Sequence, residues 1–355
     1  MAKGLQKFAK SQLIIPLISL FLLIVFNLIR DVGFFEITIK NGTIQGNVMS
    51  ILNNASELVI LAIGMTLVTA SSKGQDISVG AGAAIAGSVF VSFLKANEIT
   101  VPIIIVAFLL SCVAAIACGA FNGTLVAAFK IQPMIATLVL FTAGRSIAYI
   151  INGGVTPTVE SPLIKAIGSF IPHVPINTPI LIVCVFVLIV WLVLKFTNLR
   201  LYTQAVGINE KSARLNGINA PWIKLLSFMI LGVCVAIAGC IRVARIGLIQ
   251  HESILLGVEM DAILAVAIGG NALGGGKFSI AGSVIGAYVI QTLTTTLLAM
   301  KVPPESLIFY KAIVVITIVV ISSPIVKKYI LQLRDKIFKT PQKYKQIDEN
   351  GELSI

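Results

Sequence analysis

The side chains best placed to do chemistry are a few acidic and hydroxyl groups that interrupt long apolar segments. The first pair, Asp76 and Ser78, lies in the short stretch Gly74-Gln75-Asp76-Ile77-Ser78-Val79-Gly80. Both side chains can cap a helix that begins near residue 79, which satisfies free N–H groups where water is scarce. Alternatively, the Asp76 carboxylate lines the route of a polyhydroxylated solute, because ionisable groups inside apolar segments commonly serve a function. The combination of Asp with Ser favours capping.

A second stretch carries two acids and a run of glycines. Glu259 and Asp261 precede Gly269-Gly270-Asn271-Ala272-Leu273-Gly274-Gly275-Gly276. Arg242 and Arg245 lie across the preceding loop, so we predict ion pairs among the four charged residues, with direct contact to a solute as the alternative. The glycines let helix backbones approach closely. Residues 275–281 weakly repeat the pattern of 74–80, and such Gly-interrupted repeats point towards the pathway in transporters.

The sequence offers no residue set for catalysis or for a metal. His173 and His251 stand alone in loops, without partners for a nucleophile or a zinc ion. Gly275-Gly276-Lys277 looks like the end of a phosphate-binding loop, but Phe278 replaces the required Ser or Thr. The five cysteines lie in apolar runs and form no CxxC motif. We therefore expect neither an enzyme nor a bound cofactor.

The elements that carry these groups must be membrane helices. Of 355 residues, 57% are hydrophobic and 12% are charged, and the mean hydropathy is +0.98. A soluble domain has about 45–50% apolar and about 25% charged residues. The net charge of +12 would suit nucleic acid, but the basic residues gather at the chain ends and in one central loop. That is the positive-inside distribution of a polytopic protein in a lipid bilayer, so we expect no nucleic acid as partner.

The expected fold is all-α, with about ten transmembrane helices. The apolar segments cover about 13–29, 51–70, 81–94, 101–129, 133–151, 179–196, 222–243, 261–270, 279–298 and 307–325. The eighth is shorter than the roughly 20 residues needed to cross a bilayer, so we expect a broken or re-entrant element there. The basic residues place both termini in the cytoplasm, and 30–46 and 152–178 in outside loops. Residues 1–330 form the transmembrane domain, and 331–355 form a basic-to-acidic cytoplasmic tail.

The central loop, about residues 197–221, contains a short helix signal. Asn209 is a good N-cap, and Glu210 and Arg214 form an i,i+4 pair in the favourable order. Gly217 lies where such a helix ends, and the following proline forbids continuation. One interpretation is a solvated basic loop. The other is a docking element for a soluble partner, with Ala213 and Leu215 as its apolar surface.

Three stretches carry a family resemblance: Gly64–Val68 with Gly74–Gly80, Ala205–Ile218, and Gly257–Gly276. They resemble motifs of the permease subunits of ATP-binding-cassette (ABC) importers for ribose, galactose and xylose. The likeness extends from residue 64 to residue 286, most of the chain. Gln75, Ser212 and Asn216 depart from the family pattern but remain small or polar, and Lys277-Phe278 follows the last glycines where another glycine is usual.

The resemblance implies a permease subunit that forms the translocation pathway for a monosaccharide in a bacterial cell membrane. It implies three kinds of protein partner: ABC-type ATPase subunits, an extracytoplasmic sugar-binding protein, and a second permease copy or a homologue. It assigns coupling to the ATPase to a set in the central loop: Asn209, Glu210, Ala213, Arg214, Leu215 and Gly217. The two polar stretches above become pathway or structural motifs. A permease for a nucleoside or another small polar solute is the close alternative, and a stand-alone secondary carrier the more distant one.

Overall fold

The computed structural model describes residues 13–40, 43–171 and 174–322. In this part of the chain the main helices are α2 (Ile14–Arg30), α3 (Asn47–Ser72), α4 (Val79–Lys95), α5 (Val101–Ala127), α6 (Pro133–Ile151), α7 (Pro162–Gly168), α8 (Thr178–Phe196), α9 (Leu199–Ile208), α10 (Glu210–Leu215), α11 (Ala220–Ile246), α12 (Val258–Ile268), α13 (Ile280–Ala299) and α14 (Leu307–Ser322). Two short 3-10 turns cover Val32–Phe35 and Pro304–Ser306. Within the described residues, each apolar segment predicted to span the membrane coincides largely with a helix.

Among the described residues, six helices are long and apolar enough to cross a membrane: α3, α5, α6, α8, α11 and α13. The apolar helices α2 and α4 are shorter, with 17 residues each. The predicted eighth segment is indeed short, because α12 has only 11 residues before the glycine-rich stretch ends it.

The chain divides into two compact units, Met1–Lys311 and Ala312–Ile355. The first holds every element from α2 to α13 and the start of α14. The second, within the described residues, holds the remainder of α14. The predicted domain boundary at residue 330 and the predicted tail lie outside the described residues.

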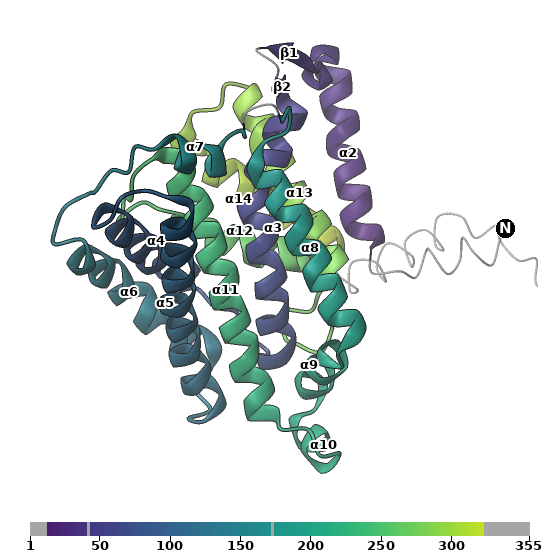
Figure 1. Cartoon of the computed structure of the whole chain (residues 1–355). Coiled ribbons are helices and arrows are strands. Elements are labelled where there is room, and N and C mark those ends of the chain that lie inside the picture. Colours follow the sequence, from purple (N-terminus) through teal and green to yellow (C-terminus); the bar gives the residue numbers. More distant parts are fainter. Residues whose placement is uncertain (1–12, 41–42, 172–173, 323–355) are drawn as a thin grey trace, which may run out of the picture. The chain divides into compact units, whose positions relative to one another are not determined.

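Helix α11 runs through the centre of the first unit, between α5 and α3 (Figure 1). Close approach is possible because glycines replace side chains at the crossing. A Cβ on Gly119 of α5 would overlap the backbone carbonyl of Phe228, and a Cβ on Gly232 of α11 would lie 2.5 Å from the Ala115 carbonyl oxygen. Small residues at such contacts are the usual means by which membrane helices pack.

Two elements lie in segments that were predicted to be loops, and the first of them corrects the all-α prediction. Strands β1 (Thr38–Lys40) and β2 (Thr43–Gln45) form an antiparallel hairpin in the segment expected to be an irregular loop. Its β-branched residues flank Asn41-Gly42, a strong hairpin sequence. The segment 152–178 likewise contains α7, capped by Ser161 and started by Pro162. Both elements are too short to show in hydropathy.

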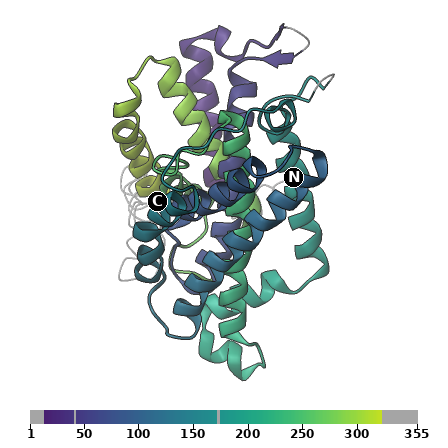
Figure 2. The ribbon, with the colours of Figure 1, turned by 60° about the vertical axis from the view of Figure 1, so that its left-hand side comes forward.

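The first unit has two distinct ends, and both views show them (Figures 1 and 2). The hairpin end carries β1 and β2, together with the junction of α11 and α12. The α10 end carries α9 and α10, together with the end of α3 and the start of α6. An isolated bridge between Thr158 and Leu248 ties two connections at the hairpin end. At the α10 end, an added Cβ on Gly74 would lie 2.8 Å from the Pro133 ring.

Candidate functional site

The central loop forms two helices at the α10 end. The predicted short helix exists as α10, and Asn209 caps it by accepting a hydrogen bond from the Ser212 N–H at 3.1 Å. Gly217 has a φ of +79°, the left-handed conformation in which glycine ends helices. The local prediction for this segment is therefore confirmed. The preceding helix α9 was not predicted, because its polar and aromatic residues resemble a loop by composition.

The acid of α10 is held by two cations. Glu210 accepts from Arg214 at 2.5 Å, as predicted, and from Lys224 of α11 at 2.5 Å. The hydrogen bond from Lys224, with the charges of Lys224 and Arg214, lowers the pKa of Glu210 from its ordinary value. Glu210 thus joins α10 to the first turns of α11, and its charge is already balanced within the loop.

The predicted role of Ala213 as partner surface is wrong. Its side chain is only 4% exposed and packs with Val206, Ala220 and Ile223. Leu215 is 89% exposed, so it alone offers the apolar surface that was expected from both residues. In a helix of only six residues, the sequence does not indicate which side chains face the protein, because that depends on where α9 and α11 lie.

Replacing Ala213 by Asp is expected to loosen the packing of α10 on α9 and α11. A carboxylate would then be buried among apolar groups without a partner, at a cost on the order of 2 kcal/mol or more. Limited proteolysis in the 197–221 segment should show faster cleavage. Leu215→Asp is the matched control, because its exposed side chain can carry a charge, and it should be cleaved at the parental rate. Equal cleavage of Ala213→Asp and the parent would contradict the observed packing.

Helix α9 packs directly on the end of α3 and on the second polar stretch at the α10 end. A Cβ on Gly207 would overlap the Ala70 carbonyl oxygen and lie 2.7 Å from the Gly276 nitrogen. The Gly276 N–H also donates to the Ala70 carbonyl at 3.1 Å, and the Gln75 amide donates to the Leu273 carbonyl at 2.9 Å. The structure therefore brings the stretches around residues 75 and 275 together beside α9.

The glycines of the second stretch have backbone roles at this junction. Gly270, Gly275 and Gly276 have φ values of +81°, +89° and +80°, which L side chains rarely adopt. The carbonyl of Gly269 lies where a Cβ on Gly282 of α13 would be. Close approach of α12 and α13 therefore requires both glycines, as the sequence predicted for this run.

Asn271 fixes the turn between α12 and α13. Its side-chain oxygen accepts from the Ser279 N–H at 2.6 Å, and its amide donates to the Ser283 hydroxyl at 2.8 Å. Ser283 in turn bonds the Thr66 hydroxyl of α3 at 2.6 Å. This chain of polar contacts is buried and complete, as groups in an apolar setting require.

Asp76 and Ser78 do not cap α4 as predicted. Ser78 is the N-cap residue, but its side chain makes no cap bond. The Asp76 carboxylate instead accepts from the Ser78 N–H at 2.8 Å and from its hydroxyl at 2.6 Å. Asn122 of α5 donates to both side chains, at 3.3 Å to Asp76 and 2.8 Å to Ser78. Asp76 thus closes the turn and anchors it to a neighbouring helix.

The cavity beside this cluster is too small for a sugar. Its volume is about 20 Å³, and both Asp76 and Asn122 are buried. A single water needs roughly 10–15 Å³, so the space admits a water molecule and no more. In this conformation Asp76 does not line an open route.

The predicted ion pairs among Arg242, Arg245, Glu259 and Asp261 are wrong. Asp261 pairs with Lys311 at 2.7 Å. Both arginines pair with Glu57 of α3, the Arg245 contact being 3.6 Å. The reason is geometric: the last turns of α11 face α3 and not α12.

Sequence reasoning missed Glu57, the acid that forms ion pairs with both of these arginines. Its side chain is 1% exposed and accepts from the Arg242 Nε at 2.8 Å. Arg245 also donates to the Asn53 carbonyl and to the Asn54 side-chain oxygen, each at 3.0 Å. The signal was present, since an acid ten residues into an apolar helix needs a partner.

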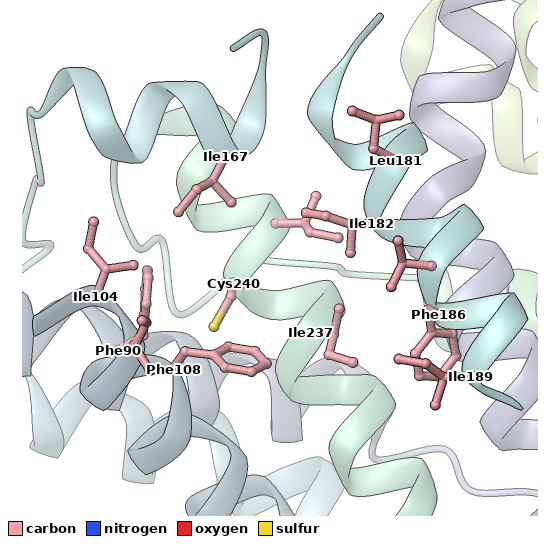
Figure 3. A pocket seen from close by; sticks show the side chains of 13 residues that line it. Phe90, Ile104, Phe108, Ile167, Leu181, Ile182, Phe186, Ile189, Ile237 and Cys240 are labelled. Atoms are coloured by element: carbon pink, nitrogen blue, oxygen red, sulfur yellow. The ribbon is translucent and has the colours of Figure 1, made fainter. Parts of the chain in front are cut away.

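An apolar groove lies between α5 and α8, with α11 behind it (Figure 3). Its volume is about 520 Å³, and Ile104, Phe108, Leu181, Phe186 and Ile237 are among the residues that line it. All of its lining residues are apolar, so it offers no hydrogen bond to a polyhydroxylated solute.

Comparison with known proteins identifies the family. A model described as "Branched-chain amino acid transport system / permease component" matches residues 47–322. The chain is 38% identical to the galactofuranose transporter permease protein YtfT of Escherichia coli (strain K12) over 86% of this chain and 88% of that one. It is 33% identical to the fructose import permease protein FruF of Bifidobacterium longum (strain NCC 2705), over 90% of each chain.

The ribose import permease protein RbsC of Escherichia coli (strain K12) is 35% identical over 78% of this chain and 85% of that one. No solved structure matches. The resemblance to monosaccharide importer permeases inferred from the three stretches is confirmed. The chain belongs to the family described as the permease component of the branched-chain amino acid transport system.

Proposed function

We propose that this chain is the membrane-spanning permease subunit of an ABC importer and forms the translocation pathway for a monosaccharide. The observation that carries the proposal is the similarity to galactofuranose, fructose and ribose permeases over 78–90% of the chain. The helical unit, in which the stretches around residues 75 and 275 meet beside α9, supports it. The chain itself needs no catalytic group or cofactor, because separate ATPase subunits would supply the energy.

The proposed topology has ten membrane helices and both termini in the cytoplasm of a bacterial cell. The ten apolar segments of the sequence all correspond to helices, six of them long enough to cross. Lys73, Lys130, Lys211 and Lys224 lie at or beside the α10 end, which favours this end as the cytoplasmic one. The hairpin end is then extracytoplasmic. Residues 1–330 would form the permease domain, and residues 331–355 the tail.

The α10 end is the proposed docking surface for the ATPase subunits. Leu215 and Ile208, 68% exposed, offer apolar contacts. A cleft of about 580 Å³ beside them is lined mainly by charged residues: Lys73, Lys130, Ile208, Asn209, Glu210, Lys211 and Arg214. Ala213 and Gly217 shape this element from within and at its end. Because Glu210 is already paired, the cleft presents net positive charge to a partner.

The two polar stretches are proposed to transmit movement of the docking surface into the bundle. Gly207 of α9 contacts both α3 and the stretch at 276, so a shift of α9 must displace their backbones. The remaining motif residues hold these stretches in place: Gly74, Gln75, Asp76, Ser78, Gly80, Glu259, Asp261, Gly269, Gly270, Asn271 and Gly275. An extracytoplasmic binding protein would deliver the sugar at the hairpin end, and a second permease copy or homologue would complete the pathway.

Uptake by the reconstituted importer tests the function. Proteoliposomes that hold this permease, its ATPase subunits and its binding protein should accumulate labelled ribose, fructose or galactose only when ATP is present inside. Uptake of a nucleoside in place of every sugar would support the related alternative. Uptake that needs an ion gradient but no ATPase would support a secondary carrier.

Single cysteines at Asn209 and Pro175 test the topology, in a background that lacks the exposed Cys184. Pro175 is exposed and its carbonyl accepts from the Ile44 N–H of β2 at 3.2 Å, so it lies at the hairpin end, whereas Asn209 lies between α9 and α10. An impermeant thiol reagent added to intact cells is expected to label residue 175 and to spare residue 209 until the membrane is opened. Labelling of both from the same side would overturn the topology and the docking assignment together.

A further inference from the structure

A polar pocket opens at the hairpin end, between α6 and the connection from α11 to α12. Its volume is about 400 Å³, and it is lined by Arg145, Ser146 and Tyr149 of α6 with His251 and Glu252. The Arg145 guanidinium donates to the carbonyls of His251 at 2.9 Å and Ile254 at 3.2 Å. These bonds hold the connection against α6 and give the pocket fixed walls. Its volume falls in the range of small-molecule sites, about 300–1,000 Å³.

One side chain of the pocket lining, His251, is incompletely satisfied. Within the described residues, its Nδ1 atom is buried without a hydrogen-bond partner, as is the Oε2 atom of Glu259, which lies outside the lining. The His251 side chain is only 7% exposed, yet it lines the pocket. A buried polar group left unpaired costs about 1–3 kcal/mol, so a ligand group that bonds His251 is favoured.

A glycine beside Arg145 leaves room for its guanidinium and for the Glu259 carboxylate. A Cβ on Gly80 would lie 2.9 Å from the Arg145 Nη2 and 2.9 Å from the Glu259 Oε2. The Arg145 guanidinium and the Glu259 carboxylate therefore lie on either side of the Gly80 Cα, where any larger residue would collide with both. With both acids ionised, the charged groups at the site are one guanidinium, Arg145, and two carboxylates, Glu259 and the exposed Glu252, so the site carries no excess of positive charge.

The lining also provides an aromatic surface. The Tyr149 ring is tilted 58° to the His251 ring at a centroid distance of 5.0 Å, and Tyr149 is 47% exposed. An aromatic face beside hydrogen-bonding groups of both kinds fits a ligand with an apolar C–H face and many hydroxyls. An anion fits poorly, because Arg145 already bonds two carbonyls and two carboxylates lie nearby. A lipid chain fits poorly among polar side chains.

We propose that this pocket is a receiving site for a neutral sugar ring as it leaves the binding protein, with the ring stacked on Tyr149 and a hydroxyl bonded to His251. The proposal rests on the function proposed above and adds a defined site at the entrance. It requires only weak binding, because the sugar must move on. Selection among sugars can then remain with the external receptor.

The test is the number of sugar molecules transported per ATP hydrolysed, in proteoliposomes that hold the complete importer. The probes are labelled ribose, fructose and galactose with saturating binding protein. Tyr149→Ala and His251→Ala are each expected to lower this ratio about tenfold, while ATP hydrolysis stimulated by the binding protein persists. Arg145 bonds the backbone at residue 251, so the His251 variant retains that contact. Tyr149→Phe should keep the ratio, because it keeps the ring face.

The matched control is Tyr310→Ala, which removes a ring of similar exposure, 45%, from α14. If the parent transports one of the sugars and the Tyr149 and His251 variants keep its ratio, the receiving site is refuted and the proposed function stands. If uptake and ATP hydrolysis fall together, the pocket is structural only and the proposal is again refuted. If the parent transports none of the three sugars under ATP, both proposals fail. In saturation-transfer NMR, the signal transferred from the complex to the sugar should be weaker for Tyr149→Ala than for the parent, and unchanged for Tyr149→Phe and Tyr310→Ala.

Discussion

Substituting Gly207 with valine is expected to abolish ATP-driven sugar uptake. A Cβ at this position would overlap the carbonyl oxygen of Ala70. That oxygen is backbone at the end of α3 and already accepts from Gly276, so it cannot turn away as a side chain would. Helix α9 would have to leave the surface formed by α3 and the second polar stretch. Overpacking of a core costs about 1–3 kcal/mol of stability. Because the clash is with backbone atoms that cannot move aside, we expect a cost near the upper end of that range for this variant.

The measurement is uptake in proteoliposomes, normalised to the amount of permease, beside the midpoint of thermal unfolding in detergent. Gly274→Ala is the matched control. Gly274 lies in the same junction, but a Cβ there meets no atom within 4 Å. This control is expected to transport at the parental rate. Parental uptake by Gly207→Val would show that α9 does not rest on α3 in the working protein.

Replacing Glu57 by alanine is expected to destabilise the permease by about 3–5 kcal/mol, the usual cost of breaking a buried ion pair from one side. Two arginines of α11 face this single buried carboxylate. Without it, two like charges remain close together near the hairpin end of α3. Because α3 and α11 pack against each other extensively, the repulsion should also weaken helix packing at the centre of the bundle.

Thermal unfolding in detergent measures this effect, with Glu57→Gln and Glu98→Ala beside it. Glutamine retains hydrogen-bond acceptance but no charge, so an intermediate loss is expected. Glu98 is an exposed acid between α4 and α5, and its removal should change the midpoint little. An unchanged midpoint in Glu57→Ala would mean that the arginines find other partners.

The sequence by itself determined where the apolar helices lie. Segment 133–151 was predicted to the residue, and segment 179–196 to within one residue of α8. Apolar length, proline at helix starts and the cap at Asn209 are local signals, so they need no knowledge of distant residues. The family was also determined from sequence, because its motifs are local strings. The short hairpin and α9 were missed since neither is apolar nor long.

Only the tertiary structure decided which groups meet. Arg242 meets Glu57, 185 residues away, and not the nearer Glu259. Ala213 turns inward and Leu215 outward, and Gly207 rests on Ala70. In a soluble helix the apolar stripe indicates the buried face, but helices in lipid are apolar on nearly every side. Their partners are chosen by close backbone packing and by buried polar pairs, which depend on all the neighbouring helices at once.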